Sequence, residues 1–237
     1  MDFTLLSKGI QKRFANFVSI VSLSDCLLCD SQISKSPIGQ LCHVCYQDLS
    51  RFPLGLDVLI HNPKLASGIK HTHYDGFACL TKYQWPFDML IKQLKYHNQI
   101  NRGRVLGELL AEHLKHMTWP KLDYVCPLPL HKNKLAKRGF NQSEILCRFL
   151  TKKLNIKPFY ELRRIKNTEA QAELTRKERL ENVKNAFHCD KDLQSKRILL
   201  IDDVLTTGAT LEQASKVLKR CGAKQVFVAT IAIKPFN

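Results

Sequence analysis

One segment near the carboxyl end restricts the fold more than any other part of the chain. In it, the apolar run Ile198–Ile201 leads into Asp202 and Asp203, and the polar stretch Thr206–Thr210 then opens a helical pattern. A nearly continuous apolar run is typical of a strand that is covered on both faces of a parallel sheet. The segment therefore predicts an α/β fold in which a strand ends on an acid pair and a loop leads into a helix.

The residue types of this segment suit a phosphorylated sugar. Open α/β sheets bind their ligands at the carboxyl ends of strands, where Asp202 and Asp203 can accept hydrogen bonds from vicinal hydroxyls. The start of a helix offers backbone N–H groups and partial positive charge to a phosphate. The predicted phosphate loop comprises Thr206, Thr207, Gly208, Ala209 and Thr210. This interpretation requires an opening to solvent, and burial of both aspartates in a salt-linked interior would overturn it.

Three other interpretations of the acid pair have to be weighed. A Walker-B metal site needs a partner P-loop, but none of the chain's ten glycines is followed by lysine. A receiver domain needs further strands that carry an aspartate and a lysine, and too little chain follows Asp203. A purely structural turn is the third alternative.

Periodicity and turn residues predict the remaining elements. Apolar positions at helical spacing, or short apolar runs, predict helices over 1–24, 87–97, 105–117, 142–154 and 208–220, with Gly222 as the last helix's cap, and strands over 74–83, 124–126, 197–202 and 225–233. Residues 51–70 contain Pro53, Gly55 and Pro63 and are predicted to be a linker, whereas the charged stretch 161–182 predicts a mobile loop or an exposed helix. No run of 18 apolar residues occurs, so we expect no integral membrane segment.

Four of the nine cysteines form two close pairs, Cys26-x2-Cys29 and Cys42-x2-Cys45, with twelve residues between the pairs. Two such knuckles can complete a tetrahedron of thiolates, for which zinc is the default ion. Two disulfides or a redox pair are the alternatives, but no secretion signal precedes the pairs and the other five cysteines are scattered singly, as in a reducing cytoplasm. We interpret His43 as a bystander, because four cysteines already fill the ligand shell.

The charge of the chain favours polyanionic partners. It carries 37 Lys+Arg against 21 Asp+Glu, a net charge of +16, and residues 121–196 alone hold 18 bases against nine acids. Such an excess attracts polyanions, although a lysine-rich surface without a ligand is the alternative. The candidate nucleic-acid contacts are Lys95, Arg138, Arg163, Arg164, Arg176 and Arg179. Aromatic residues near lysine or arginine, such as Tyr96 and Tyr160, can stack on nucleobases, although core packing is their commoner role.

The segment Ile198–Thr210 resembles the phosphoribosyl pyrophosphate (PRPP) fingerprint of type I phosphoribosyltransferases. Along most of its length the chain also resembles the competence protein F (ComF/ComFC, GntX-like) family. The residues that carry this second resemblance are the four cysteines, Leu94-Lys95-Tyr96, Pro127–Leu130, Arg138–Gln142, Arg164, Gln171, Leu174, Arg179, Asn182, Ala186-Phe187 and the fingerprint itself.

The resemblance implies a Rossmann-like parallel sheet flanked by helices in residues 61–237, preceded by an N-terminal helix and zinc-ribbon module in residues 1–60. It also implies that PRPP binds Asp202, Asp203 and the Thr206–Thr210 loop, with Mg²⁺ bridging the sugar and the pyrophosphate. The pyrophosphate loop would then span residues 127–141, with Lys132 and Arg138 as anion contacts. For Lys95, an anion contact and a snorkelling surface residue are equally weighted.

For function, the family resemblance implies a cytoplasmic protein that handles single-stranded DNA as it enters the cell during natural transformation. The inner face of the cytoplasmic membrane is one place where it would act. The alternative is an active phosphoribosyltransferase that acts on a small acceptor in nucleotide metabolism. PRPP binding is expected in both, while turnover stays open, because no segment supplies a pocket for an acceptor base. A third interpretation is a scaffold between competence translocation-channel proteins and recombination proteins.

Overall fold

The computed structural model describes residues 25–33, 36, 38–69, 72–97, 99–167 and 182–234. The chain divides into two compact units, Met1–Leu49 and Ser50–Asn237. The helix predicted over 1–24 lies outside the described residues. In the smaller unit, one isolated bridge encloses the first cysteine pair and a second bridge precedes the other pair, whose Cys45 lies in the short helix α2 (His43–Gln47).

The larger unit is built on a five-stranded sheet whose neighbouring strands all pair in parallel. The order of the strands is β1 (Gly76–Lys82), β7 (Gln225–Ile233), β6 (Arg197–Leu205), β2 (Tyr124–Pro127) and β3 (Lys157–Pro158). In this register Ile201 of β6 lies opposite Pro127 of β2, and Asp202 lies opposite Thr230 of β7. The acid pair therefore lies at the carboxyl end of the central strand, beside the point where β2 ends.

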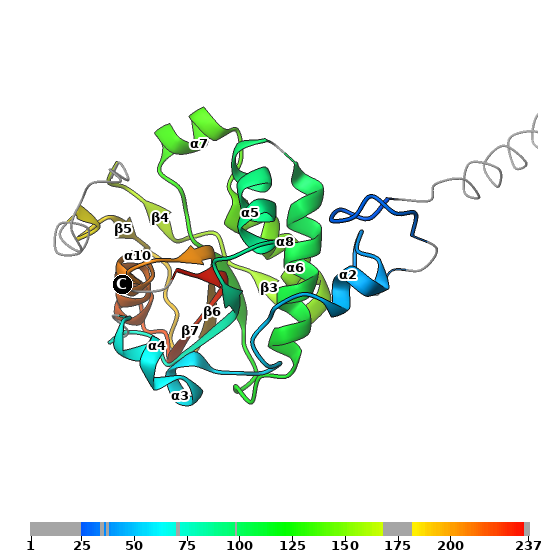
Figure 1. The fold of residues 1–237 in the computed structure, drawn as a ribbon. Coiled ribbons are helices and arrows are strands. Elements are labelled where there is room, and N and C mark those ends of the chain that lie inside the picture. The colour runs from blue at the N-terminus through cyan, green and yellow to red at the C-terminus, as the bar shows by residue number, and fades with distance from the viewer. Residues whose placement is uncertain are drawn as a thin grey trace, which may run out of the picture. The chain divides into compact units, whose positions relative to one another are not determined.

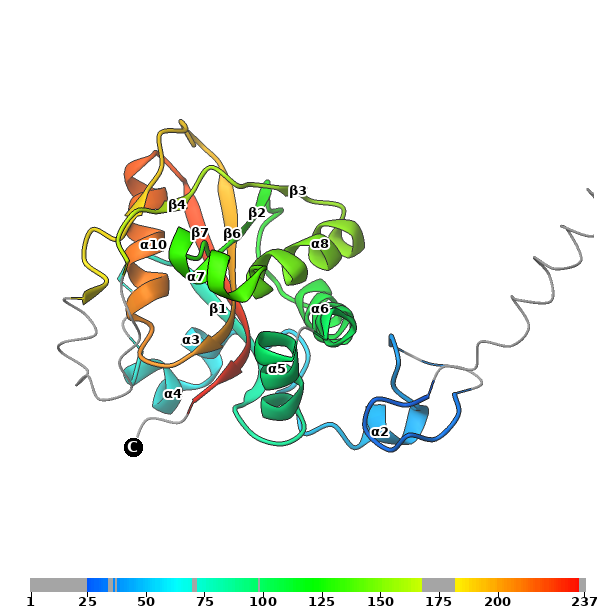
Figure 2. The same cartoon turned by 90° about the horizontal axis from the view of Figure 1, so that it is seen from above.

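Helices cover both faces of this sheet (Figures 1 and 2). On one side lie α5 (Phe87–Tyr96), α6 (Ile100–Lys115) and α8 (Gln142–Leu154), and on the other lie α3 (Val58–His61), α4 (Pro63–Ser67) and α10 (Ala209–Arg220). Apolar residues at helical spacing turn one face of each long helix inward, as in α10, where Leu211, Ala214 and Leu218 are buried. The apolar strands fill the layer between them.

Most predicted elements agree with the structure, with shifted ends. Strand β6 continues to Leu205, three residues beyond the predicted end, so the acid pair lies within the last part of the strand rather than at its end. Helix α6 begins at Ile100, five residues before the predicted start. Helix α10 has Cys221 at its C-cap, and Gly222 follows with φ +92°, a left-handed conformation that suits glycine.

The linker predicted over residues 51–70 is wrong. This stretch forms α3 and α4, and its Asp57 is only 3% exposed. The Asp57 carboxylate accepts hydrogen bonds from the backbone N–H groups of Leu59 and Phe77, at 3.0 and 3.1 Å, and from Trp119 Nε1 at 2.7 Å. One buried acid thus fixes the proline-containing stretch to β1 and to the segment that precedes β2.

The predicted pyrophosphate loop, residues 127–141, contains the helix α7 (Lys132–Arg138), which ends on Gly139 in the left-handed conformation. The charged stretch that follows α8 includes β4 (Arg163–Arg164), which pairs antiparallel with β5 (Phe187–His188). Residues 168–181, between these two strands, lie outside the described residues. Among the helices that the structure describes, none is both long and apolar enough to cross a membrane.

Candidate functional site

Asp202 faces a small hollow at the carboxyl end of β6. Residues 204–211 line the rest of this hollow, which has a volume of about 30 Å³. This is close to the volume that one water molecule takes up in the liquid, so a phosphorylated sugar must extend well beyond it. The Asp202 carboxylate accepts hydrogen bonds from Ser143 Oγ at 3.0 Å and from the backbone N–H of Asp203 at 2.9 Å. Burial and the neighbouring Asp203 carboxylate together raise the pKa of Asp202 to about 7.

Asp203 is buried and paired with a cation. Its Oδ2 atom lies 2.5 Å from Nζ of Lys95, which stands in the last turn of α5, and the two side chains are 4% and 19% exposed. Burial alone would lower the pKa of Lys95, but the Asp203 and Asp202 carboxylates outweigh it and raise that pKa. The lysine therefore stays charged, and the acid pair consists of one half-buried carboxylate at the hollow and one buried carboxylate in a salt link.

The loop after β6 has the shape of an anion site. Gly208 adopts φ +75°, a left-handed conformation that favours glycine, and it forms the N-cap of α10 without a capping side chain. The backbone N–H of Ala209 donates to Thr207 Oγ1 at 3.4 Å. Together with Thr206 and Thr210, these residues line the hollow. The first turn of a twelve-residue helix thus faces the space beside Asp202, where its N–H groups and dipole favour a negative charge.

A buried glutamate holds this helix start in place. Glu212, 1% exposed, accepts hydrogen bonds from Thr72 Oγ1 at 2.5 Å, from His73 Nδ1 at 2.6 Å and from the backbone N–H of His73 at 3.2 Å. Burial would raise the pKa of Glu212, but these donors outweigh it and lower that pKa. The sequence gives no signal for this contact, because the partners are 139 and 140 positions apart.

The two cations that were predicted to contact pyrophosphate, Lys132 and Arg138, are the first and last residues of α7. Arg138 donates a hydrogen bond to Gln142 Oε1 at 2.6 Å and lies 5.7 Å above the ring of Tyr96, which is 71% exposed. Lys132 begins α7 and is exposed. Within the described residues, neither cation hydrogen-bonds to the acid pair or to the phosphate loop.

The two arginines of β4 have different surroundings. Arg163 is exposed and lies 3.9 Å from Glu161. Arg164 is half-buried, and its guanidinium lies 5.4 Å above the Phe187 ring. Burial lowers the pKa of Arg164 while the charge of Asp202 opposes that shift. Arg176 and Arg179, also predicted as nucleic-acid contacts, lie outside the described residues.

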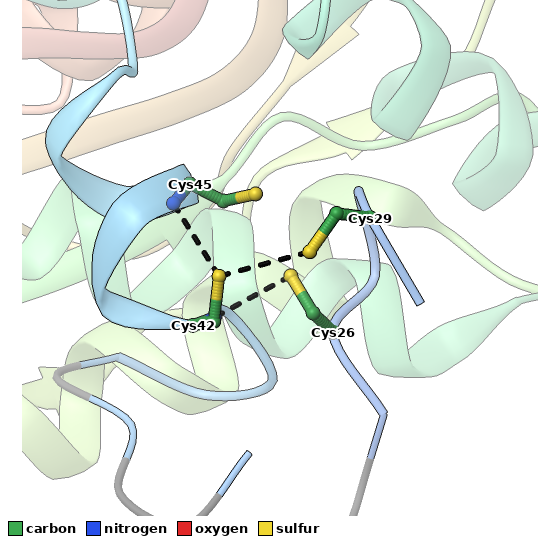
Figure 3. Close-up of side chains that lie close together, drawn as sticks. All are labelled: Cys26, Cys29, Cys42 and Cys45. Carbon is green, nitrogen blue, oxygen red and sulfur yellow. Dashed lines mark hydrogen bonds between the residues drawn. The ribbon is translucent and has the colours of Figure 1, made fainter. Parts of the chain in front are cut away.

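The four cysteines of the smaller unit converge on one point (Figure 3). Their sulfur atoms all lie within 4.8 Å of one another, and the Cys29 and Cys42 sulfurs are 3.7 Å apart. Four thiolates bound to zinc at about 2.3 Å would have their sulfurs about 3.8 Å apart, so the cluster has the size of a tetrahedral site. The geometry fits a metal ion, as the spacing in the sequence predicted.

Backbone amides support the cluster. The N–H groups of Cys42 and Cys45 donate to the sulfurs of Cys26 and Cys42, each at 3.4 Å. The hydroxyl and the backbone of Ser31 lower the pKa of Cys29 to about 6, whereas burial and the other sulfurs raise the pKa of Cys45. Such uneven thiol acidities are expected where several sulfurs share one site, and a bound cation would stabilise all four as thiolates.

Comparison with known proteins places the chain in a family. Residues 138–235 match the phosphoribosyl transferase domain. Competence protein F of Haemophilus influenzae is 28% identical over 222 residues, which cover 87% of this chain and 96% of that protein. The DNA utilization protein YhgH of Salmonella typhi is 30% identical over 216 residues, which cover 86% of this chain and 94% of that protein.

A solved purine phosphoribosyltransferase of Pyrococcus horikoshii aligns with 67% of this chain and covers 79% of its own, at 22% identity and a TM-score of 0.35. The domain match and the parallel sheet with flanking helices confirm the predicted phosphoribosyltransferase-like fold, and the four-cysteine group precedes it. The chain therefore belongs to the family of competence protein F and the DNA utilization protein YhgH, and it carries a phosphoribosyl transferase domain.

Proposed function

We propose that the larger unit binds PRPP at the end of β6. The observation that carries the proposal is the position of Asp202, which faces the hollow formed by the loop at residues 206–210 and the start of α10. Asp202 and Asp203 would accept hydrogen bonds from the ribose hydroxyls. The loop amides and the threonine hydroxyls would donate to the 5′-phosphate. The match to a phosphoribosyl transferase domain supports this choice of ligand.

Magnesium would enter this site on the ligand rather than on the protein. A magnesium ion prefers oxygen ligands in octahedral geometry and is commonly held by substrate phosphates together with one or two carboxylates. In the free protein Asp203 is engaged by Lys95, and one oxygen of Asp202 accepts from Ser143, so few carboxylate oxygens are free before the ligand binds. The ion would supply charge between the sugar hydroxyls and the pyrophosphate, while the chain contributes the Asp202 carboxylate and the loop donors.

In the smaller unit, Cys26, Cys29, Cys42 and Cys45 would hold one structural zinc ion. Support comes from the sulfur spacing, which matches a tetrahedral thiolate site, and from the small size of this unit. A segment with so few buried apolar residues needs such an ion to stay folded. Elemental analysis of the purified protein tests this assignment, with about one zinc per chain expected.

We further propose that the protein handles single-stranded DNA in the cytoplasm. The names of its relatives, competence protein F and DNA utilization protein YhgH, support a role in DNA uptake or use. The basic segment 121–196 would follow the phosphate backbone. Exposed Tyr96, with Arg138 on one side of its ring, and exposed Tyr160 would stack bases. Competence translocation-channel and recombination proteins would be its protein partners.

Two assays separate this function from the enzymatic alternative. Binding of a labelled oligonucleotide should weaken steeply as salt rises, and binding that is absent at low salt or indifferent to salt would contradict the DNA proposal. A phosphoribosyltransferase would consume PRPP and release pyrophosphate in the presence of an acceptor. The domain match favours this second activity enough to test it against a panel of bases and amines. If PRPP binds but no pyrophosphate appears across the panel, the protein is a binding module.

A further inference from the structure

Both carboxylates of the acid pair already have donors from the chain itself. Ser143 Oγ, at the start of α8, donates to Asp202, and Lys95 Nζ, at the end of α5, pairs with Asp203. A sugar that uses these carboxylates must compete with the two side chains. The competition at Asp203 is the stronger one, because Lys95 brings a full charge into a site that is only 4% exposed.

Lys95 has the freedom to change partner without movement of the helix. It stands one residue before the end of α5, which is anchored by the fully buried Ile91 and Leu94. Its side chain keeps 19% exposure, so part of it reaches solvent beside the buried acid. A lysine has three rotatable donors on a flexible four-carbon stem, and a short swing is therefore enough to bring the charge to a neighbouring anion.

We propose that Lys95 is an exchangeable counter-ion that determines the specificity of the site for a sugar phosphate with a second anionic group, such as the diphosphate of PRPP. In the free protein Lys95 neutralises Asp203. In the complex, the sugar displaces it from Asp203 and the ammonium group pairs with the diphosphate. This inference rests on the proposed PRPP site and adds the feature by which that site recognises its ligand.

The exchange explains how the site would distinguish two related ligands. PRPP offers Lys95 a new anionic partner, so the cost of separating it from Asp203 is repaid within the complex. Ribose 5-phosphate fills the same loop but carries no diphosphate, so Lys95 would have to leave Asp203 without compensation or continue to block it. The free protein should therefore bind PRPP at least about tenfold more tightly than ribose 5-phosphate, which corresponds to one charge-assisted contact.

The first experiment is calorimetric titration of the full-length protein with PRPP and with ribose 5-phosphate, each in the presence of Mg²⁺. Lys95→Met should lower the affinity for PRPP about tenfold and change that for ribose 5-phosphate less than about threefold. Lys92→Met is the matched control, since Lys92 stands on the same helix but pairs with Asp88 at 2.9 Å and is 55% exposed. This control should bind both ligands like the wild type.

A second pair of variants protects the test against a simple loss of folding. Lys95→Met leaves Asp203 buried without a counter-charge, so the same comparison is made between Asp203→Asn and the double variant with Lys95→Met. A lysine that only supports Asp203 has no role once that charge is removed, and the double variant would then match Asp203→Asn. The exchange instead predicts that the double variant binds PRPP about tenfold more weakly than Asp203→Asn does, and that their affinities for ribose 5-phosphate differ little.

The outcomes separate this inference from the proposed function. Suppose that the wild type binds PRPP and that Lys95→Met lowers the affinity for both ligands equally or for neither. The exchange is then wrong, and the PRPP site stands. If the wild type has no preference for PRPP over ribose 5-phosphate, the exchange is also wrong. If the wild type binds neither ligand, the proposed function itself fails.

Discussion

The hydroxyl of Ser143 donates a hydrogen bond to Oδ1 of Asp202 across 59 positions of the chain, at 3.0 Å. Ser143 belongs to the first turn of α8 and Asp202 to the end of β6, so the contact joins a helix start to the sheet edge where the proposed ligand binds. Asn141, the N-cap of α8, donates to the carbonyl of Leu128 at 3.0 Å and fixes the same turn to the segment after β2. The orientation of Asp202 is therefore set before any ligand arrives.

Replacement of Asp202 by asparagine should weaken PRPP binding. The substitution keeps the size of the side chain but replaces a charged acceptor for the ribose hydroxyl by a neutral one, and hydrogen bonds to charged groups contribute about 1.5–3 kcal/mol. We expect a roughly tenfold to hundredfold loss of affinity in calorimetry. Asp190→Asn is a suitable control, because Asp190 is 72% exposed and pairs with His188. An affinity equal to that of the wild type would exclude Asp202 from the site.

Much of the fold could be predicted from the sequence because apolar strands leave a clear pattern. The predicted strand over 225–233 has the same bounds as β7, because nearly all of its residues are buried and apolar. The linker over residues 51–70 was wrong for a physical reason. Prolines and polar residues usually mark loops, but here Asp57 accepts hydrogen bonds from its own helix start and from two distant segments, and the distant contacts leave no trace in local periodicity.

Some contacts of the candidate site could likewise be predicted from the sequence, and others could not. Contacts within one segment, such as Asp202 with the Thr206–Thr210 loop, follow from the order of residues and could be proposed in advance. Ser143 and Glu212 could not, because each meets its partner only through the tertiary fold. Lys95 was named for its charge, but its partner Asp203 depends on how α5 packs beside β6.

Removal of zinc should unfold the smaller unit and leave the larger one intact. In the proposed site the four thiolates would share one ion, and a small metal-bound segment has little apolar core of its own. After treatment with a chelator, hydrogen exchange read by mass spectrometry should rise in peptides that cover residues 25–49 and stay slow in β6 and β7. Cys26→Ser should behave like the chelated protein. Unchanged exchange in residues 25–49 would contradict a structural metal.

The two neighbouring arginines of β4 should differ in their effect on DNA binding. Arg163 is exposed, so Arg163→Ala should remove one phosphate contact and reduce the slope of log affinity against log salt by about 1. Arg164 lies over Phe187 and near Asp202, so Arg164→Ala should leave the slope unchanged and lower the melting temperature. Fluorescence anisotropy at several salt concentrations measures the slope. Equal slopes for Arg163→Ala and the wild type would remove Arg163 from the DNA surface.

Glu212 should stabilise the larger unit above its ordinary pKa of 4.5 and lose this effect in acid. Its pKa is lower in the folded protein than in the unfolded chain, so the unfolded chain binds the proton first as the pH falls, and stability declines. At pH 6 the wild type should exceed Glu212→Gln by about 2 kcal/mol, and the difference should shrink below pH 4.5. Urea unfolding followed by tryptophan fluorescence reports this unit alone, because Trp85 and Trp119 both lie in it. A difference that does not change with pH would contradict the assignment.

Asp202 should act on stability in the opposite direction. Its pKa rises from 3.8 to about 7 on folding, so between these values the folded protein holds a proton that the unfolded chain has lost. Stability contributed by this group is therefore greatest in acid and falls as the pH rises through that window. The physical cause is burial beside Asp203, whose own charge is balanced by Lys95 but still repels a second carboxylate.

Asp202→Asn removes this titration. Without ligand, the variant should gain stability relative to the wild type as the pH rises from 4 to 7, because it never has to place a second negative charge beside Asp203. Urea unfolding of both proteins at pH 5 and pH 7.5, followed by tryptophan fluorescence, measures the gain. The same substitution is expected to weaken PRPP binding, so a variant that is more stable but binds less well would show that the charge of Asp202 is kept for the ligand at a cost to the fold. Parallel pH profiles for the two proteins would mean that Asp202 titrates as an ordinary exposed carboxylate.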